Sequence, residues 1–145
     1  MRTYSLAYLT ASALKPADMV TLAAELGYSH VGLRLLPNAP GAPQQHLIGD
    51  AAALRETQQR LRDTGVSVFD LEIIRIGSGF DPQQYVPLLE AGAALGAHSL
   101  LVVGDDPDRT RLAENFARLC ELTASYKLCA NLEFMPWTAV KNARD

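Results

Sequence analysis

The sequence predicts an α/β protein built from parallel (β/α) repeats, with five strands and about four helices forming part of a barrel. Apolar strand-like segments alternate with amphipathic helical segments, a pattern typical of a parallel sheet with right-handed crossovers. Three helical segments stop at a glycine, Gly27, Gly65 or Gly96, and a strand follows at once. Few residues follow the last strand, so we expect a single partial (β/α)8-barrel domain over 1–145, truncated after strand five and continuing beyond 145 in the intact protein.

The five predicted strands are short segments with a period of two or a continuous apolar run. They lie at residues 5–10, 31–35, 66–76, 100–103 and 129–134. Alternation along a strand puts Arg34, in the second strand, and Glu133, in the fifth, on the face that points away from the helices. We therefore expect both side chains to point toward the barrel interior.

The four predicted helices each begin at a capping residue or a first-turn proline. These starts are Pro16, Asp50, Asp81-Pro82 and Asp106-Pro107. Asp106 is for this reason interpreted as part of a turn and helix cap, not as a ligand.

An open, doubly wound sheet is the alternative architecture, because five strands in 145 residues also suit that kind of domain. The fifth strand argues against it. Ala130, Leu132 and Phe134 share a face that needs a covering helix, yet residues 138–145 supply only about two helical turns. A barrel that continues would cover this face, so the sequence favours the barrel.

Composition and charge exclude several classes of function. The formal net charge is −3 and Lys and Arg form no stripe, so we expect no nucleic-acid partner. No apolar run approaches the ~20 residues of a membrane span and no secretory leader is visible, so we expect a cytoplasmic protein without membrane contact. Cys120 and Cys129 lack the spacing of a zinc site or a disulfide framework, and we expect two buried free thiols.

Candidate reactive residues lie at the C-terminal ends of the predicted strands, where parallel βα architectures gather them. Glu133, beside Asn131, is an inner-face carboxylate whose burial requires a cation or a basic partner. Two interpretations stay open, since Glu133 either binds a metal or forms an ion pair with Arg34. For Asp70 and Glu72, on the third strand, the pattern favours a structural role.

Other candidates are Tyr8, near the end of the first strand, and Trp137, just after the fifth. His46 lies in the long loop after the second strand, which either borders a pocket or is a solvated excursion. His30 and His98 enter their strands from the N-terminal end, the side associated with stability in barrels, so we expect no catalytic role for them. The sequence contains no glycine-rich phosphate loop, GxSxG elbow or HExxH motif.

Two segments carry a family resemblance. The first is Ala23-Ala24-Glu25-Leu26-Gly27-Tyr28 leading to Val31-Gly32-Leu33-Arg34. The second and more specific one is Leu132-Glu133-Phe134-Met135-Pro136-Trp137, a glutamate that ends the fifth strand before an aromatic-rich proline segment. With these segments the chain resembles the xylose isomerase-like TIM-barrel superfamily, the sugar phosphate isomerase/epimerase group. The likeness covers the whole chain but only the first five of eight strands.

The resemblance implies a divalent metal, Mn, Mg, Co or Zn, held by a Glu on strand five, an Asp on strand six, a His on strand seven and a Glu on strand eight. Glu133 matches the first ligand, and the other three would lie beyond Asp145. The metal site is therefore expected to be incomplete in this chain, and residues 1–145 alone are expected to be inactive.

The resemblance also implies proton transfer next to a sugar carbonyl through an enediolate, with Glu133 as a metal ligand and an acid/base carboxylate. The candidates for contacting a sugar or polyol-like substrate are Arg34, Tyr8, His46, Glu72 and Trp137. The superfamily also contains dehydratases of shikimate-type acids and endonucleases of abasic DNA, and the acidic net charge argues against the endonucleases. A non-catalytic half-barrel that associates with a second copy is the alternative from another class, because an open parallel edge favours association.

Overall fold

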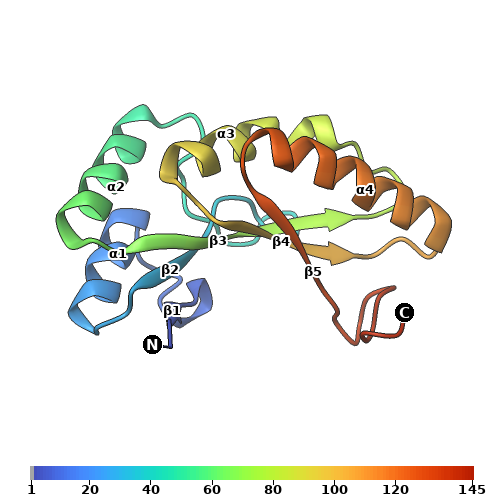
Figure 1. The fold of residues 1–145 in the computed structure, drawn as a ribbon, viewed down its shortest axis with the longest axis horizontal. Helices are drawn as coiled ribbons and strands as arrows, with labels where there is room; N and C mark the ends of the chain where they lie inside the picture. Colours follow the sequence, from blue (N-terminus) through green and yellow to red (C-terminus); the bar gives the residue numbers. More distant parts are fainter. Residues whose placement is uncertain (1) are drawn as a thin grey trace.

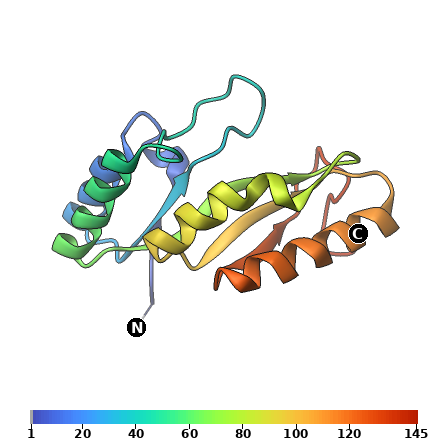
Figure 2. The same cartoon turned by 90° about the horizontal axis from the view of Figure 1, so that it is seen from above.

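The computed structural model describes residues 2–145, which form one sheet of five parallel strands and four α-helices. The strands lie in the order β1-β2-β3-β4-β5, so each βα unit adds its strand next to the previous one. Within these residues the helices follow one side of the curved sheet and leave the other side uncovered (Figures 1 and 2). A doubly wound sheet reverses its strand order and has helices on both faces, whereas this sequential order is that of a partial TIM barrel, as the sequence predicts.

The bounds of the elements, in chain order, are β1 (Ser5–Leu6), the 3-10 turn η1 (Tyr8–Thr10), α1 (Pro16–Glu25), β2 (His30–Arg34), α2 (Ala51–Thr64), β3 (Ser67–Ile76), the 3-10 turn η2 (Pro82–Tyr85), α3 (Val86–Leu95), β4 (Ser99–Gly104), α4 (Arg109–Ser125) and β5 (Cys129–Glu133). All four predicted helices and all five predicted strands are therefore present in the described chain.

Local signals explain most of the boundaries. Asp50 caps α2, because its carboxylate accepts hydrogen bonds from the backbone N–H groups of Ala52 and Ala53. Gly65 ends the same helix in the left-handed region, with a φ of 72° that only glycine adopts at little cost. Some predicted boundaries are wrong. The third helix is predicted to begin at Asp81-Pro82, but residues Pro82–Tyr85 form a 3-10 turn and α3 begins at Val86. The first strand stops at Leu6, since the backbone from Ala7 onward makes a 3-10 turn.

The core lies between the sheet and its helices. Side chains from alternate strand positions meet apolar side chains from the helices, and each fully buried one contributes about 1.5–3 kcal/mol to the free energy of unfolding. The fully buried members include Val31, Leu33, Leu71, Leu100 and Val102 from the strands and Met19, Leu89 and Leu119 from the helices. This packing uses the face of the sheet that the helices cover. The side chains on the opposite, inner face do not contribute to this core and are available for a functional site.

The two cysteines of the described chain are free, as predicted, but the expectation that both are buried is wrong. Cys120 is half-buried in α4, and Cys129 is exposed at the start of β5. No helix within residues 2–145 combines the length and the apolar character needed to cross a membrane.

The start of α4 also differs from the prediction. Asp108, not Asp106, is its capping residue. Asp106 is fully buried instead, and it accepts hydrogen bonds of 2.7 Å from both Nε and Nη2 of Arg111. Asp106 also accepts a hydrogen bond of 3.0 Å from the backbone N–H of Asp108, so it stabilises the turn that precedes the helix.

We expect Asp106→Asn to lower the free energy of unfolding at pH 7 and to do so less at acidic pH. The Arg111 side chain lowers the pKa of Asp106, and the backbone N–H of Asp108 lowers it further. A carboxyl with a lowered pKa stabilises the fold above its unfolded-state pKa and loses that contribution as the pH falls through its folded-state pKa. Urea unfolding at pH 7 and pH 3, with the exposed Asp63→Asn as control, measures the difference; a difference that grows at pH 3 would contradict this account.

Candidate functional site

The candidate site lies on the inner face of the sheet, the face without helices. The register pairs Gly32 with Asp70 and Arg34 with Glu72, so these four residues share this face. On the next strands, Ser99 pairs with Cys129, Leu101 with Asn131 and Val103 with Glu133, while Asp70 pairs with Ser99. Glu133 is the last residue of β5, at the C-terminal end where barrel enzymes gather their reactive groups.

Arg34 and Glu72 form a buried ion pair at the C-terminal end of β2 and within β3. The Arg34 guanidinium donates from Nε (3.0 Å) and Nη2 (2.5 Å) to the same oxygen of Glu72, Oε2. The two residues are only 8% and 9% exposed, so each charge depends on the other. The pairing of Arg34 with Glu133, one of the two alternatives from the sequence, is wrong, because Glu72 on the neighbouring strand is the closer carboxylate.

Tyr8 completes this cluster. Its ring lies under the Arg34 guanidinium at 4.5 Å from the ring centroid, a cation–π contact. The Tyr8 hydroxyl is buried and has no hydrogen-bond partner within the described chain. The cluster of Tyr8, Arg34 and Glu72 is therefore a buried group on the inner face, and the Tyr8 hydroxyl is its one polar group without a partner in the described chain.

Glu133 has a different environment. It is exposed and forms no ion pair with any Lys, Arg or His among residues 2–145. It lines a cavity of about 360 Å³ on the inner face together with Asp70, Ser99, Leu101 and Asn131. The Glu133 carboxylate is thus available to a ligand, whereas the Glu72 carboxylate is neutralised.

Hydrogen bonds hold the segment after Glu133 against the C-terminal end of β4 and the start of α4. The backbone N–H of Val140 donates to the carbonyl of Gly104 (3.1 Å), and the N–H of Ala139 donates to Asp105 (3.3 Å). Asp105 also pairs with Arg75 of β3 at 2.7 Å. These contacts tie the ends of three strands together around the last residue of β5.

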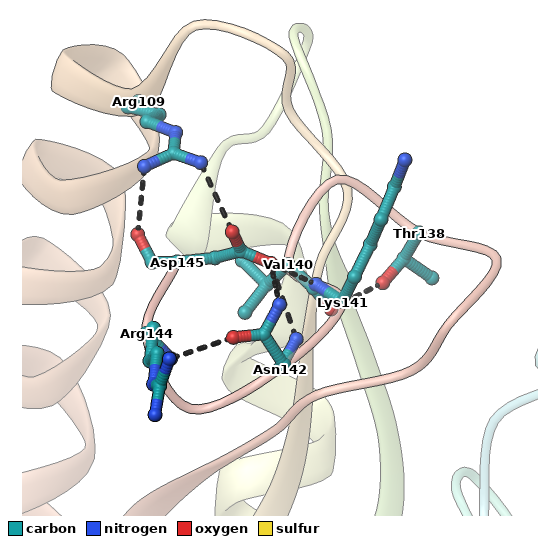
Figure 3. A network of polar contacts seen from close by, with 7 residues as sticks. All are labelled: Arg109, Thr138, Val140, Lys141, Asn142, Arg144 and Asp145. Carbon is teal, nitrogen blue, oxygen red and sulfur yellow. Dashed lines mark hydrogen bonds and ion pairs between the residues drawn. The ribbon is translucent and has the colours of Figure 1, made fainter.

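The last residues close this loop (Figure 3). The Asp145 carboxylate accepts hydrogen bonds from the backbone N–H of Lys141 (2.7 Å) and from both the backbone and the side chain of Asn142. Its other oxygen pairs with Arg109, at the start of α4, at 3.1 Å. The Lys141 N–H lowers the pKa of Asp145 the most, so this carboxylate stays charged and holds the loop against α4.

The other candidates lie elsewhere. His46 is exposed and borders a separate cavity of about 470 Å³ between the starts of α1 and α2, with Lys15 and Gln44. Trp137 follows Glu133 in the loop and is 77% exposed. His30 and His98 lie at the N-terminal side of the sheet, where their rings flank Phe69 with centroid distances of 5.9 and 5.8 Å. The structure therefore brings Tyr8, Arg34 and Glu72 together, and leaves His46 apart from the inner face.

The inner face offers few ligands for a metal ion. Within residues 2–145 no three or more His, Cys, Asp or Glu side chains gather in a way that would hold a metal. Glu133 offers a free carboxylate, and Asn131 offers an amide oxygen on the same face. Oxygen donors of this kind suit Mg²⁺ or Mn²⁺, but these two groups alone are fewer than such an ion needs.

The sequence pattern favours a structural role for Asp70, and the structure places this residue in the lining of the inner-face cavity. Burial raises the pKa of its carboxyl, and the nearby Glu72 and Glu133 carboxylates raise it further. A signal was present in the sequence, since Gly32 interrupts an otherwise apolar strand and glycine there often marks a close approach of another group.

Comparisons with known proteins show the fold. No protein-family model and no curated protein sequence matches the chain. Among solved structures, the chain is similar to a xylose isomerase domain containing protein from Salmonella typhimurium LT2, with a TM-score of 0.73 and 17% identity over 97% of this chain and 54% of that one. It is also similar to the zinc-bound IolI protein (TM-score 0.69, 13% identity, 96% and 54% covered). A third is a sugar phosphate isomerase/epimerase from Parabacteroides distasonis ATCC 8503 (TM-score 0.60, 13% identity, 90% and 50% covered).

The chain spans about half the length of these structures. At such low identities the likeness concerns the backbone, and it agrees with the partial TIM barrel described above.

Proposed function

We propose that this chain supplies five βα units of a metal-dependent isomerase or epimerase of sugars or sugar phosphates. One observation carries the proposal. Of the two glutamates on the inner face, Glu72 is neutralised by Arg34, whereas Glu133, at the C-terminal end of β5, has no ion-pair partner within residues 2–145 and faces a cavity. An unpaired carboxylate at this end of a parallel sheet is typical of a catalytic or metal-binding group.

The solved structures support this class of function. One is described as a sugar phosphate isomerase/epimerase, and another contains a bound zinc atom. The isomerase or epimerase reaction moves a proton at the carbon next to a carbonyl, and a bound divalent ion would polarise the oxygens there. In this proposal Glu133 is one metal ligand and also takes up or returns the proton, while the remaining ligands come from other residues of the intact protein.

The Tyr8–Arg34–Glu72 cluster has a supporting role in this proposal. Its buried ion pair fixes Arg34 at the end of β2, where the guanidinium N–H groups not used by Glu72 are donors for a substrate hydroxyl or phosphate. Trp137, in the loop fixed to β4 and α4, supplies an apolar surface for a sugar ring. His46 borders a different cavity. It would contact a substrate in the inner-face cavity only after a movement of the loop that follows β2.

Metal titration of the full-length protein tests the proposal. We expect the metal-free protein to bind Mn²⁺, and Glu133→Gln to weaken binding by more than about a hundredfold, because even partners outside the ligand shell are worth ten- to a hundredfold. Glu121→Gln, the same change on the exposed surface of α4, is the matched control. Mn²⁺ affinity that is unchanged in Glu133→Gln would refute the assigned role. A protein that binds no metal and forms dimers would instead support the self-associating half-barrel.

A further inference from the structure

We infer that Asp70 binds a hydroxyl group of the sugar in the inner-face cavity, as a substrate-binding residue in addition to Glu133. This inference deepens the proposed function and rests on it, since it concerns the same cavity. Three observations support the inference. Gly32 leaves space for the Asp70 side chain, Asp70 has no cationic partner within residues 2–145, and Asp70 lines a cavity together with other polar residues.

Gly32 makes the space that Asp70 occupies. Asp70 and Gly32 are register partners on β3 and β2, and a Cβ atom added to Gly32 would lie 2.4 Å from Oδ1 of Asp70. Real Cβ atoms essentially never come so close to an oxygen, so the side chain holds this position only because residue 32 is glycine. The carboxyl therefore lies across β2 on the inner face, in a position that an alanine would close.

Asp70 has no cation to neutralise it. None of the ion pairs within residues 2–145 includes Asp70, and the charged groups that act on it most are two carboxylates, Glu72 and Glu133. The two arginines of this face, Arg34 and Arg75, are already paired with Glu72 and Asp105. A half-buried carboxyl in such surroundings is stabilised by a partner that accepts or donates a hydrogen bond without adding negative charge.

A sugar hydroxyl has this property. It is neutral and both donates and accepts, so it bonds to Asp70 whether the carboxyl is ionised or protonated. The nearby carboxylates of Glu72 and Glu133 disfavour an anionic partner at this position. The cavity of about 360 Å³ is within the range of small-molecule sites, and Ser99 and Asn131 add further polar groups to its lining.

Binding of free monosaccharides to the full-length protein tests the inference. The probes are D-glucose, D-fructose, D-xylose and D-ribose, measured by saturation-transfer NMR and by calorimetry in the presence of EDTA. We expect Asp70→Ala to weaken binding of the best probe by about ten- to a hundredfold, the value of a hydrogen bond to a charged group. Asp63→Ala, on the exposed surface of α2, is the matched control and should bind as the wild type does.

Gly32→Ala provides a second, independent variant. It leaves the carboxyl in the chain but displaces it, so binding should weaken in the wild-type background and should not weaken further in the Asp70→Ala background. Three results would each overturn the inference. The first is an unchanged affinity in Asp70→Ala, the second is additive losses of affinity in the double variant, and the third is no binding of any probe to the wild type.

The result is separable from the test of the proposed function. If Mn²⁺ binding depends on Glu133 but the sugar affinity is the same with and without Asp70, only the role of Asp70 fails. If sugar binding depends on Asp70 and no Mn²⁺ is bound, the metal-dependent function fails and the hydroxyl site stands.

Discussion

Replacing Glu72 by alanine should lower the free energy of unfolding by about 3–5 kcal/mol, one of the largest effects of any single substitution in this chain. The variant leaves the Arg34 guanidinium, only 8% exposed, without a counter-charge. Its remaining close partner is the ring of Tyr8, and a cation–π contact is worth about 0.5–2 kcal/mol, which is too little to replace the carboxylate. The cost arises from the uncompensated charge rather than from a lost contact.

Urea unfolding followed by circular dichroism measures this effect. Glu121→Ala on α4 is the control, and we expect it to change the free energy by no more than about 0.5 kcal/mol. The double variant Arg34→Met/Glu72→Leu removes both charges and should recover most of the loss, because apolar replacement of a buried pair is often neutral. A loss for Glu72→Ala as small as that of the control would mean that solvent reaches Arg34 and that the pair is not structural.

Leu71→Ala should lower the free energy of unfolding by about 2–5 kcal/mol. Leu71 is fully buried on the outer face of β3, where it packs against α3. A Cβ atom added to Gly92 of α3 would lie 3.0 Å from Cδ1 of Leu71, so this glycine allows the helix to approach the sheet closely. Truncating the leucine therefore opens a cavity between an internal strand and its covering helix.

The same contact predicts a coupling between the two positions. In the wild type, alanine at position 92 would press against Leu71 and Leu128, which offsets the gain of about 1 kcal/mol in helix propensity. Leu71→Ala removes one of these two contacts and leaves Leu128, so Gly92→Ala should be less unfavourable in that background than in the wild type. Thermal unfolding of the four proteins measures this coupling, and strictly additive effects would show that the two side chains are not in contact.

The fold could be predicted from the sequence because its signals are local. Prolines, capping aspartates and glycines mark the ends of the helices, and the alternation of apolar residues marks the strands. The errors occur where tertiary contacts decide. Tyr8 turns inward beneath Arg34, which shortens the first strand, and the Asp106–Arg111 pair delays the start of α4.

The site could be predicted only in part. Alternation along β2, β3 and β5 correctly predicts that Arg34, Glu72 and Glu133 share the inner face. Which carboxylate meets the arginine depends on the register between strands, which a single sequence does not specify, so the pairing of Arg34 with Glu72 became visible only in the structure. The position of His46 depends on the path of a long loop, for which the residues carry no periodic signal.

The most direct test of the central claim is a crystal structure of the full-length protein soaked in Mn²⁺, with anomalous diffraction recorded at the manganese edge. We expect an anomalous peak at about 2.0–2.3 Å from a carboxylate oxygen of Glu133, the range of such metal–oxygen bonds. A peak elsewhere, or Glu133 paired with a lysine or arginine from another part of the protein, would contradict the account.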